Sequence, residues 1–441
     1  MIRRLLPLAL ASALVSTPVF AEDLMQTYEL ARQGDPGLAI AESQRQIARE
    51  GSVQARAGLL PAVNGSVDFG RGYNAGSSIR GSSRSYGASL SQSVFNWSTI
   101  NQYRSAREND VAGGYDLDAA NDELIVRTAD AYFRVLEATE TLAAAEAAEE
   151  AFQKQFDYAD KRLEVGLAPI TDVHEARAQY DSARANTILV RNALKDAFEA
   201  LAEITGQPIA ALRGLPDDFT PELPAGGDAE SWVATAVERN PTLQAAGHAV
   251  RAAEHGVQTA RGGHLPSLSL SAGYNNDTGW DNIPGPAASR DEGHSIGLRL
   301  SVPIFAGGAT QSGVREAIAR RDIAQDQDEQ IKRAIVRNTR NAYQSLVAGV
   351  SEIEARRLAL VSAQSAYEAS QVGLEVGTRT VIDVLINQQN LFAARQNYAA
   401  AKYNYLRSRL GLEQAAGSLD VATVQDINRL LTVDVTAPTQ Q

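Results

Sequence analysis

The sequence predicts an α+β membrane protein that contains two copies of one structural unit. Three observations support this fold class. The stretch "LEVG" followed by an aspartate occurs twice, with Asp172 and Asp383 at equivalent places 211 residues apart. Each copy contains a long proline-free segment rich in Ala, Glu and Arg, a composition that favours helix. Each copy also contains two segments in which apolar and polar residues alternate, as they do in strands.

The first 21 residues have the pattern of a secretory signal peptide. Arg3 and Arg4 precede an apolar run, and Val19 and Ala21 place small residues where a signal peptidase reads them. A membrane-anchoring helix is the alternative, but Pro7 interrupts the run, which is shorter than the ~20 residues that span a bilayer. We therefore expect residues 1–21 to be removed on export. No later run has this length and character, so strands are expected to make any membrane crossing.

The composition narrows the class of protein further. The sequence contains no cysteine, so we expect no disulfides and no lipid-modified N-terminal cysteine. A formal net charge of −12 without a basic cluster argues against a nucleic-acid partner. No HExxH, P-loop or nucleophile-elbow motif points to an enzyme. His248 and His255 lie seven apart but lack a third ligand, so we interpret them as part of a helix surface and expect no metal or cofactor.

The first repeat is predicted over residues 22–206 and the second over residues 240–417. Each is expected to contain a shorter helix, two strands, a long helix and a return helix. The long helices are predicted from Ser98 to about Leu163 and from Thr310 to Leu374. Each would be roughly 100 Å long at 1.5 Å per residue. A helix of that length cannot fold back within a compact domain, so it must act as a strut.

Each long helix is predicted to end in a tight turn and to be followed by an antiparallel return helix. Gly166 and Gly377 stand where a helix C-cap requires a left-handed residue, and Asp172 and Asp383 stand where the next helix starts. The return helices carry apolar stripes at seven-residue spacing, which predicts coiled-coil packing. The stripes comprise Val173, Tyr180, Thr187, Leu194 and Leu201 in one copy and Val384, Leu391, Tyr398, Tyr405 and Leu412 in the other.

Four segments of ~10 residues alternate between apolar and polar side chains, as in Val63, Val67 and Phe69 against Asn64, Ser66 and Asp68. A half-buried hairpin of a soluble domain gives the same alternation. Four such segments with aromatic residues near their ends are typical of strands that face lipid. The turn-rich stretches between the strands, residues 71–85 and 275–293, are expected to be loops.

Four strands cannot enclose a lumen, because barrel closure needs about eight, and a bilayer tolerates no open strand edge. The chain must therefore associate with copies of itself. Two copies would give eight strands and a filled interior, whereas three would give twelve strands and space for a pore. Polar inward faces favour three. Residues 207–239 and 418–441 lie outside the repeats and are expected to be a linker and a C-terminal segment, without structural signal after Val433.

Several motifs resemble the TolC family of bacterial outer-membrane export ducts, over residues 22 to about 430. They are "EDLMQTYELAR", "LLPAV", "SQSVF", "TADAYFRVL", "VGLAPITDVHEARAQYD", "GHLPSLSL", "VPIFAGG", "VGTRTVIDVL" and "KYNYLRSRLGL". The resemblance implies a homotrimer with a twelve-stranded antiparallel β-barrel among the lipids of the outer membrane. It also implies a twelve-helix coiled-coil tunnel in the periplasm and a small mixed equatorial domain formed by residues 207–239 and 418–441.

The resemblance further implies partners and cargo. A periplasmic adaptor (membrane fusion) protein and an inner-membrane ABC or proton-driven transporter would recruit the tunnel, whose tip then opens. The cargo would be exported proteins, as in type I secretion, or small molecules, as in multidrug efflux. The chain itself would catalyse no reaction.

By the same resemblance, the tips of the helical hairpins form a closed entrance. Arg379 would donate hydrogen bonds to Thr171 and Asp172 as a latch, and Asp383 would form an acidic ring at the narrowest point. The turns that dock the adaptor would comprise Val165, Gly166, Leu167, Val376, Gly377 and Thr378.

Two residues depart from the family pattern. Leu374 stands where a tyrosine hydroxyl joins the latch, and Ile386 replaces a second aspartate of the ring. Fewer carboxylates focus less field, so we expect a weaker electrostatic filter.

Other interpretations of these residues stay open. Asp172 and Asp383 can simply cap helix N-termini, and Arg379 can be a solvated charge. For the whole chain, one alternative is a passive trimeric porin with a periplasmic extension, which would conduct without a partner. The other is a soluble periplasmic coiled-coil scaffold, which would be extracted without detergent.

Overall fold

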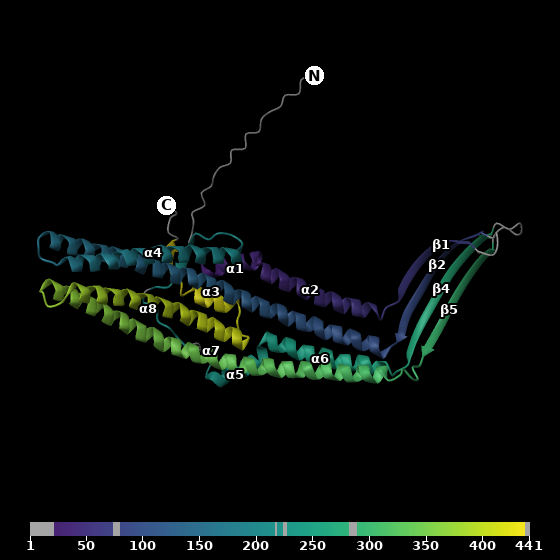
Figure 1. Ribbon diagram of the computed structural model, residues 1–441. Coiled ribbons are helices and arrows are strands. Elements are labelled where there is room, and N and C mark those ends of the chain that lie inside the picture. The colour runs from purple at the N-terminus through teal and green to yellow at the C-terminus, as the bar shows by residue number, and fades with distance from the viewer. Residues whose placement is uncertain (1–21, 74–79, 217, 224–226, 282–288, 437–441) are drawn as a thin grey trace, which may run out of the picture.

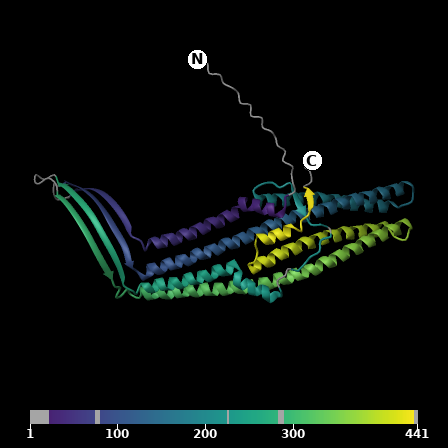
Figure 2. The ribbon, with the colours of Figure 1, turned by 180° about the vertical axis from the view of Figure 1, so that it is seen from behind.

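The computed structural model describes residues 22–73, 80–216, 218–223, 227–281 and 289–436. The predicted signal peptide therefore lies outside the described residues. The molecule is elongated, with a four-stranded sheet at one end, the turns of two helical hairpins at the other and several short elements between them (Figure 1). The view from behind shows the same separation (Figure 2).

The elements follow each other in the same order twice, which confirms the predicted duplication. The first series is α1 (Leu24–Gly34), α2 (Pro36–Ala57), β1 (Ala62–Tyr73), β2 (Arg80–Phe95), α3 (Trp97–Glu164) and α4 (Ile170–Thr205). The second is α5 (Ala229–Arg239), α6 (Pro241–Gly262), β4 (Ser267–Asp281), β5 (Ser289–Ser301), α7 (Ala309–Glu375) and α8 (Val381–Ala416). The helix α5 takes the place of α1 although it falls within the predicted linker; the domain boundaries themselves stay predictions.

The two long helices confirm the predicted struts. α3 has 68 residues and α7 has 67, because neither contains a proline that would remove a backbone donor. Gly113 does not break α3; a Cβ there would lie 3.0 Å from the Cβ of Ala48, so the glycine lets α2 approach closely. The stripes of the return helices are buried or half-buried, as the seven-residue spacing predicts.

The sheet is antiparallel, in the order β1-β2-β4-β5, so β1 and β5 are its edges. Its strands have 12, 16, 15 and 13 residues and extend into the stretches expected to be loops, so that expectation is wrong for much of both stretches. Gly72 pairs with Gly81, and Thr278 pairs with Arg290. Backbone pairing in a hairpin continues beyond the apolar residues because every paired N–H and C=O gains a partner.

The two faces of the sheet differ completely in chemistry. One row of paired residues, Val63, Leu90, Ala272 and Ile296, is apolar, and the adjacent row on the other face contains only serine, glycine and asparagine. Val63 is 69% exposed and Ile296 is 80% exposed, so no other element within the described ranges covers the apolar face. Separately, no helix within the described ranges is both long and apolar enough to cross a membrane.

Midway along the molecule, a segment from the middle of the chain and a segment near its C-terminus form a second small sheet. β3 (Ala211–Gly214) pairs with β6 (Val433–Thr436), beside α9 (Val421–Asn428). The Tyr132 hydroxyl of α3 accepts from Arg213 N–H at 2.9 Å and donates to Arg213 C=O at 2.7 Å. The sequence after Val433 carried no structural signal, but residues 434–436 belong to strand β6, which β3 connects to the main core. Residues 437–441 lie outside the described residues.

Candidate functional site at the hairpin tips

The turns of the two hairpins have the same backbone. Gly166 has φ +73° and Gly377 has φ +79°, the left-handed conformation predicted for both glycines. The N–H of Leu167 donates to Arg162 C=O at 2.8 Å, and the N–H of Thr378 donates to Gly373 C=O at 2.8 Å. Both helices therefore end in a Schellman motif, which satisfies their last carbonyl groups.

Apolar side chains project from both turns. Val165 and Leu167 are each 68% exposed and Val376 is 69% exposed. Exposed apolar side chains that lie close together on a surface are typical of a site that binds another protein.

In the second tip, between α7 and α8, the backbone and the side-chain stem of Arg379 contact Gly373. The Arg379 N–H donates to Gly373 C=O at 3.1 Å. A Cβ added to Gly373 would lie 2.6 Å from Arg379 Cγ, so the arginine stem covers this glycine. The role of Gly373 could not be predicted from the sequence, because its contact depends on how the turn brings position 379 back over the helix.

The second tip also binds its own aspartate. The Asp383 carboxylate accepts from Thr380 N–H at 2.9 Å and from the Thr380 hydroxyl at 2.8 Å, while Asp383 N–H donates to that hydroxyl at 3.2 Å. This capping box begins α8. The hydrogen bonds from Thr380, with the nearby Arg379 charge, lower the pKa of Asp383 below its usual 3.8. Asp383 thus caps a helix and also keeps an exposed negative charge at the tip.

The first tip, between α3 and α4, lacks this cap. Pro169 precedes α4 and supplies no side-chain acceptor to the helix. Asp172 lies in the first turn and makes no side-chain hydrogen bond or ion pair in the part of the chain that the structure describes. The arginine of this tip is on the helix: Arg162 donates to Leu167 C=O at 3.2 Å and lies over the Tyr158 ring.

The predicted latch does not form within one chain. Among the described residues, Arg379 makes no hydrogen bond or ion pair to Thr171 or Asp172. Leu374 packs beside the buried cluster of Phe152, Val381 and Leu385. The latch remains a prediction that needs a second hairpin from elsewhere.

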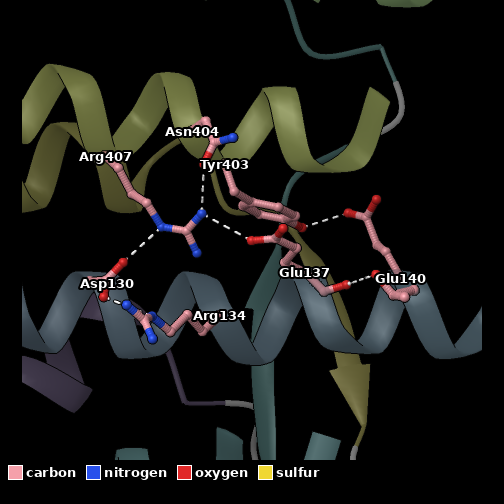
Figure 3. Close-up of polar contacts among 8 residues, drawn as sticks. Asp130, Arg134, Glu137, Glu140, Tyr403, Asn404 and Arg407 are labelled. Atoms are coloured by element: carbon pink, nitrogen blue, oxygen red, sulfur yellow. Dashed lines mark hydrogen bonds and ion pairs between the residues drawn. The ribbon is translucent and has the colours of Figure 1, made fainter. Parts of the chain in front are cut away.

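Above the tips, a polar joint connects the two repeats. Arg407 of α8 lies between two acids of α3, with Nε 2.8 Å from Asp130 and Nη1 2.9 Å from Glu137 (Figure 3). The Tyr403 hydroxyl donates to Glu140 at 2.6 Å (Figure 3). Burial and the neighbouring Glu140 charge raise the pKa of Tyr403, so its proton stays in place. No sequence pattern predicts this joint, because its partners are more than 260 residues apart.

The architecture defines a class, that of channels in which a β-sheet domain is continued by long helical hairpins. The chain aligns with the outer-membrane channel CmeC of Campylobacter jejuni with a TM-score of 0.78 and 21% identity, over 93% of this chain and 90% of that one. It aligns with the outer membrane protein VceC of Vibrio cholerae with a TM-score of 0.74 and 19% identity, over 89% and 96%.

The chain belongs to the outer membrane efflux protein family, whose model matches residues 27–207 and 232–418. It is 34% identical to the outer membrane protein TolC of Vibrio cholerae over 98% of this chain and 99% of that protein. It is also 34% identical to Escherichia coli TolC, over 98% and 90%. The alkaline protease secretion protein AprF of Pseudomonas aeruginosa is 28% identical over 93% and 88%. The predicted family is therefore confirmed, and the protein is an outer-membrane export channel.

Proposed function

We propose that three copies of this chain form a conduit through the outer membrane and the periplasm, through which exported cargo leaves the cell. The observation that carries this proposal is the continuity of each long helix. α3 runs unbroken from Trp97, next to the sheet, to Glu164, next to a tip turn, and α7 does the same in the second repeat. One polypeptide thus joins a surface suited to lipid with an entrance about 100 Å away.

The sheet supports the threefold assembly. Its apolar face is exposed and its polar face carries small side chains, which suits lipid outside and water inside. The edge strands β1 and β5 each have one partner in the chain, and open edges are not tolerated in a bilayer. Three copies close twelve strands, and the two hairpins of each copy then supply the twelve helices of the tunnel wall.

The tips support a gate at the periplasmic end. Arg379 carries a cationic donor on the second hairpin, and Asp172 carries an uncommitted acceptor on the first. The two do not meet within one chain, so the latch would join the second hairpin of one copy to the first hairpin of its neighbour. Asp383 would contribute one carboxylate per copy to a ring at the entrance, whereas Ile386, 52% exposed, contributes none.

The exposed turns support docking of partner proteins. Val165, Leu167 and Val376 would contact a periplasmic adaptor, which links the tunnel to an inner-membrane transporter. The relatives include both a protease secretion protein and the efflux protein BepC of Brucella suis, 26% identical over 83% of this chain. Secreted proteins and small molecules are accordingly the two cargo classes. The transporter, not the conduit, would supply the energy.

Two measurements test the proposal. The chain contains no cysteine, so Val165→Cys or Val376→Cys gives a single attachment point for a cross-linker in intact cells. We expect both variants to capture a periplasmic adaptor, and Ser43→Cys on α2 to capture none.

The purified protein in lipid should be trimeric and should conduct weakly until the latch is broken. A lone chain without a conducting pathway would contradict the proposal. A fully open trimer without any partner would instead favour a passive porin.

A further inference from the structure

Resting on the proposed trimer, we propose that Arg299 of one copy forms an ion pair with Asp68 of the next copy across the β5–β1 joint. This pair fixes the register in which the barrel closes. Both residues lie on the face of the sheet that would form the inner wall of the barrel, away from the tip gate.

Arg299 differs in charge and size from the other side chains on the polar face of the sheet. Serine and glycine predominate on this face, and Arg299 is the one cation among its described residues. Its cross-strand partner is Ser269, and its neighbours on the same face of β5 are Gly297 and Ser301. Arg299 is exposed and makes no hydrogen bond or ion pair to any described residue of its own chain.

Asp68 is the corresponding acid at the opposite edge. It lies on the polar face of β1, opposite Ser85, and is exposed without an ion pair among the described residues. Since β1 and β5 are the two edges of the sheet, closing the barrel places each copy's Arg299 beside the next copy's β1. The two edges are therefore complementary in charge on the face that turns inward.

The apolar face selects the register of this joint. On β1 the apolar residues end at Phe69, followed by Arg71; on β5 they begin at Ile296, preceded by His294. Aligning the two boundaries places Phe69 opposite Ile296 and Val67 opposite Leu298, which keeps the lipid-facing band continuous.

In that antiparallel register Arg299 lies opposite Ser66 and one diagonal step from Asp68. Diagonal residues are about 7–8 Å apart, within reach of a long side chain such as arginine.

The inclination of the strands gives an independent check. A row of paired residues runs from Ser66 through Gly87 and Asn275 to Gly293. If Ser66 of the next copy lies opposite Arg299, the row returns to β1 six residues further along β5, at Arg299 instead of Gly293. The row then shifts by about 20 Å along the strands while it crosses four strand spacings, which measure about 19 Å. The strands are then inclined by about 45°, within the range of known barrels.

Each neighbouring register fails at least one of the two criteria. An offset of eight residues instead of six inclines the strands by more than about 50°, beyond the usual range. An offset of four residues keeps an acceptable inclination but places Phe69 opposite His294, which interrupts the apolar band. The register that brings Arg299 next to Asp68 satisfies both.

Cysteine pairs on the lipid-facing side test the register without touching the ion pair. We expect oxidation of Val67→Cys/Leu298→Cys to give covalent trimers, because directly opposed Cα atoms lie at disulfide distance. The matched pairs Val67→Cys/Ile296→Cys and Val67→Cys/Leu300→Cys report registers shifted by two residues and should cross-link at least tenfold less. Preferential cross-linking of either shifted pair would overturn the register.

Neutralisation tests the ion pair itself. Asp68→Asn and Arg299→Gln should each lower the temperature at which the trimer dissociates in detergent, and the double variant should lower it no further. Asp291→Asn, an acid on the same face of β5, serves as the matched control and should add its effect to that of Arg299→Gln. Additive losses for the Asp68 and Arg299 variants would refute the pairing. The mass of the unmodified protein is measured in parallel, so a monomer would refute the trimer itself and not merely its register.

Discussion

The two hairpin tips have one backbone and different side-chain chemistry. In both, a left-handed glycine ends the helix through the same pair of backbone hydrogen bonds. In the first tip, Arg162 lies on the helix and reaches the turn. In the second, Gly373 occupies the position equivalent to Arg162, and Arg379 lies in the turn and covers that glycine.

The aspartates differ in the same way. Asp383 is bound by Thr380 in a capping box, whereas Asp172 follows Pro169 and makes no side-chain hydrogen bond among the described residues. The two copies therefore share the scaffold, and in the proposed latch the second tip would donate and the first would accept. Such complementary tips suit a ring in which first and second hairpins alternate.

The largest effect is expected from a side chain at Gly373. Gly373→Leu would displace Arg379, because even a Cβ would lie 2.6 Å from its Cγ. Loss of a charge-assisted hydrogen bond worth about 1.5–3 kcal/mol should raise the open probability of the channel roughly tenfold or more in single-channel recordings.

The equivalent change in the first tip, Arg162→Leu, is the matched control and should leave the open probability unchanged. Equal effects of the two variants would contradict the division of roles between the tips.

A smaller effect is expected at the acceptor. Asp172→Asn keeps the shape of the side chain but removes its charge, so the latch should weaken and the open probability should rise by up to about tenfold. Glu175→Gln changes an exposed carboxylate about one helical turn further along α4 and controls for the loss of a negative charge. If the control opens the channel equally, general electrostatics and not a latch holds the tips.

A local effect is expected from the caps. Thr380→Ala should destabilise the start of α8 by about 1 kcal/mol, visible as faster hydrogen exchange of its first-turn amides. Pro169→Ser should have the opposite effect on α4, because it supplies the missing acceptor. Unchanged exchange at both tips would show that packing against neighbouring helices, not capping, orders these turns.

The smallest effect is expected from acid titration. The folded-state pKa of Asp383 is lowered, so its negative charge is present above the unfolded value and is lost only as pH falls through the lower folded value. Cation preference, read from reversal potentials, should stay constant from pH 7 to about 5 and decline below the usual value of 3.8. Asp383→Asn should reduce it already at pH 7; no change there would remove Asp383 from the entrance ring.

These contrasts also separate what the sequence could predict from what it could not. The long helices, the four strands and the left-handed glycines could be predicted, since proline spacing, alternation and glycine position act locally. β3 and β6 could not, because each has four residues and their pairing joins Gly214 to Val433. The contact of Gly373 with Arg379 depends on the path of the turn, and the contacts of Arg407 with α3 depend on how two helices pack. Neither can be predicted from a local sequence pattern.

The unbroken course of α7 and α8 has a mechanical consequence. α8 is 36 residues long, or about 54 Å, and contains no proline that would bend it, so a rotation about its C-terminal end would carry the whole helix as one rod. A swing of about 6° around the middle of the molecule would displace the tip by ~5–6 Å, close to the pitch of one helical turn. In the proposed trimer, the entrance would therefore widen while every backbone hydrogen bond along the helices stays intact.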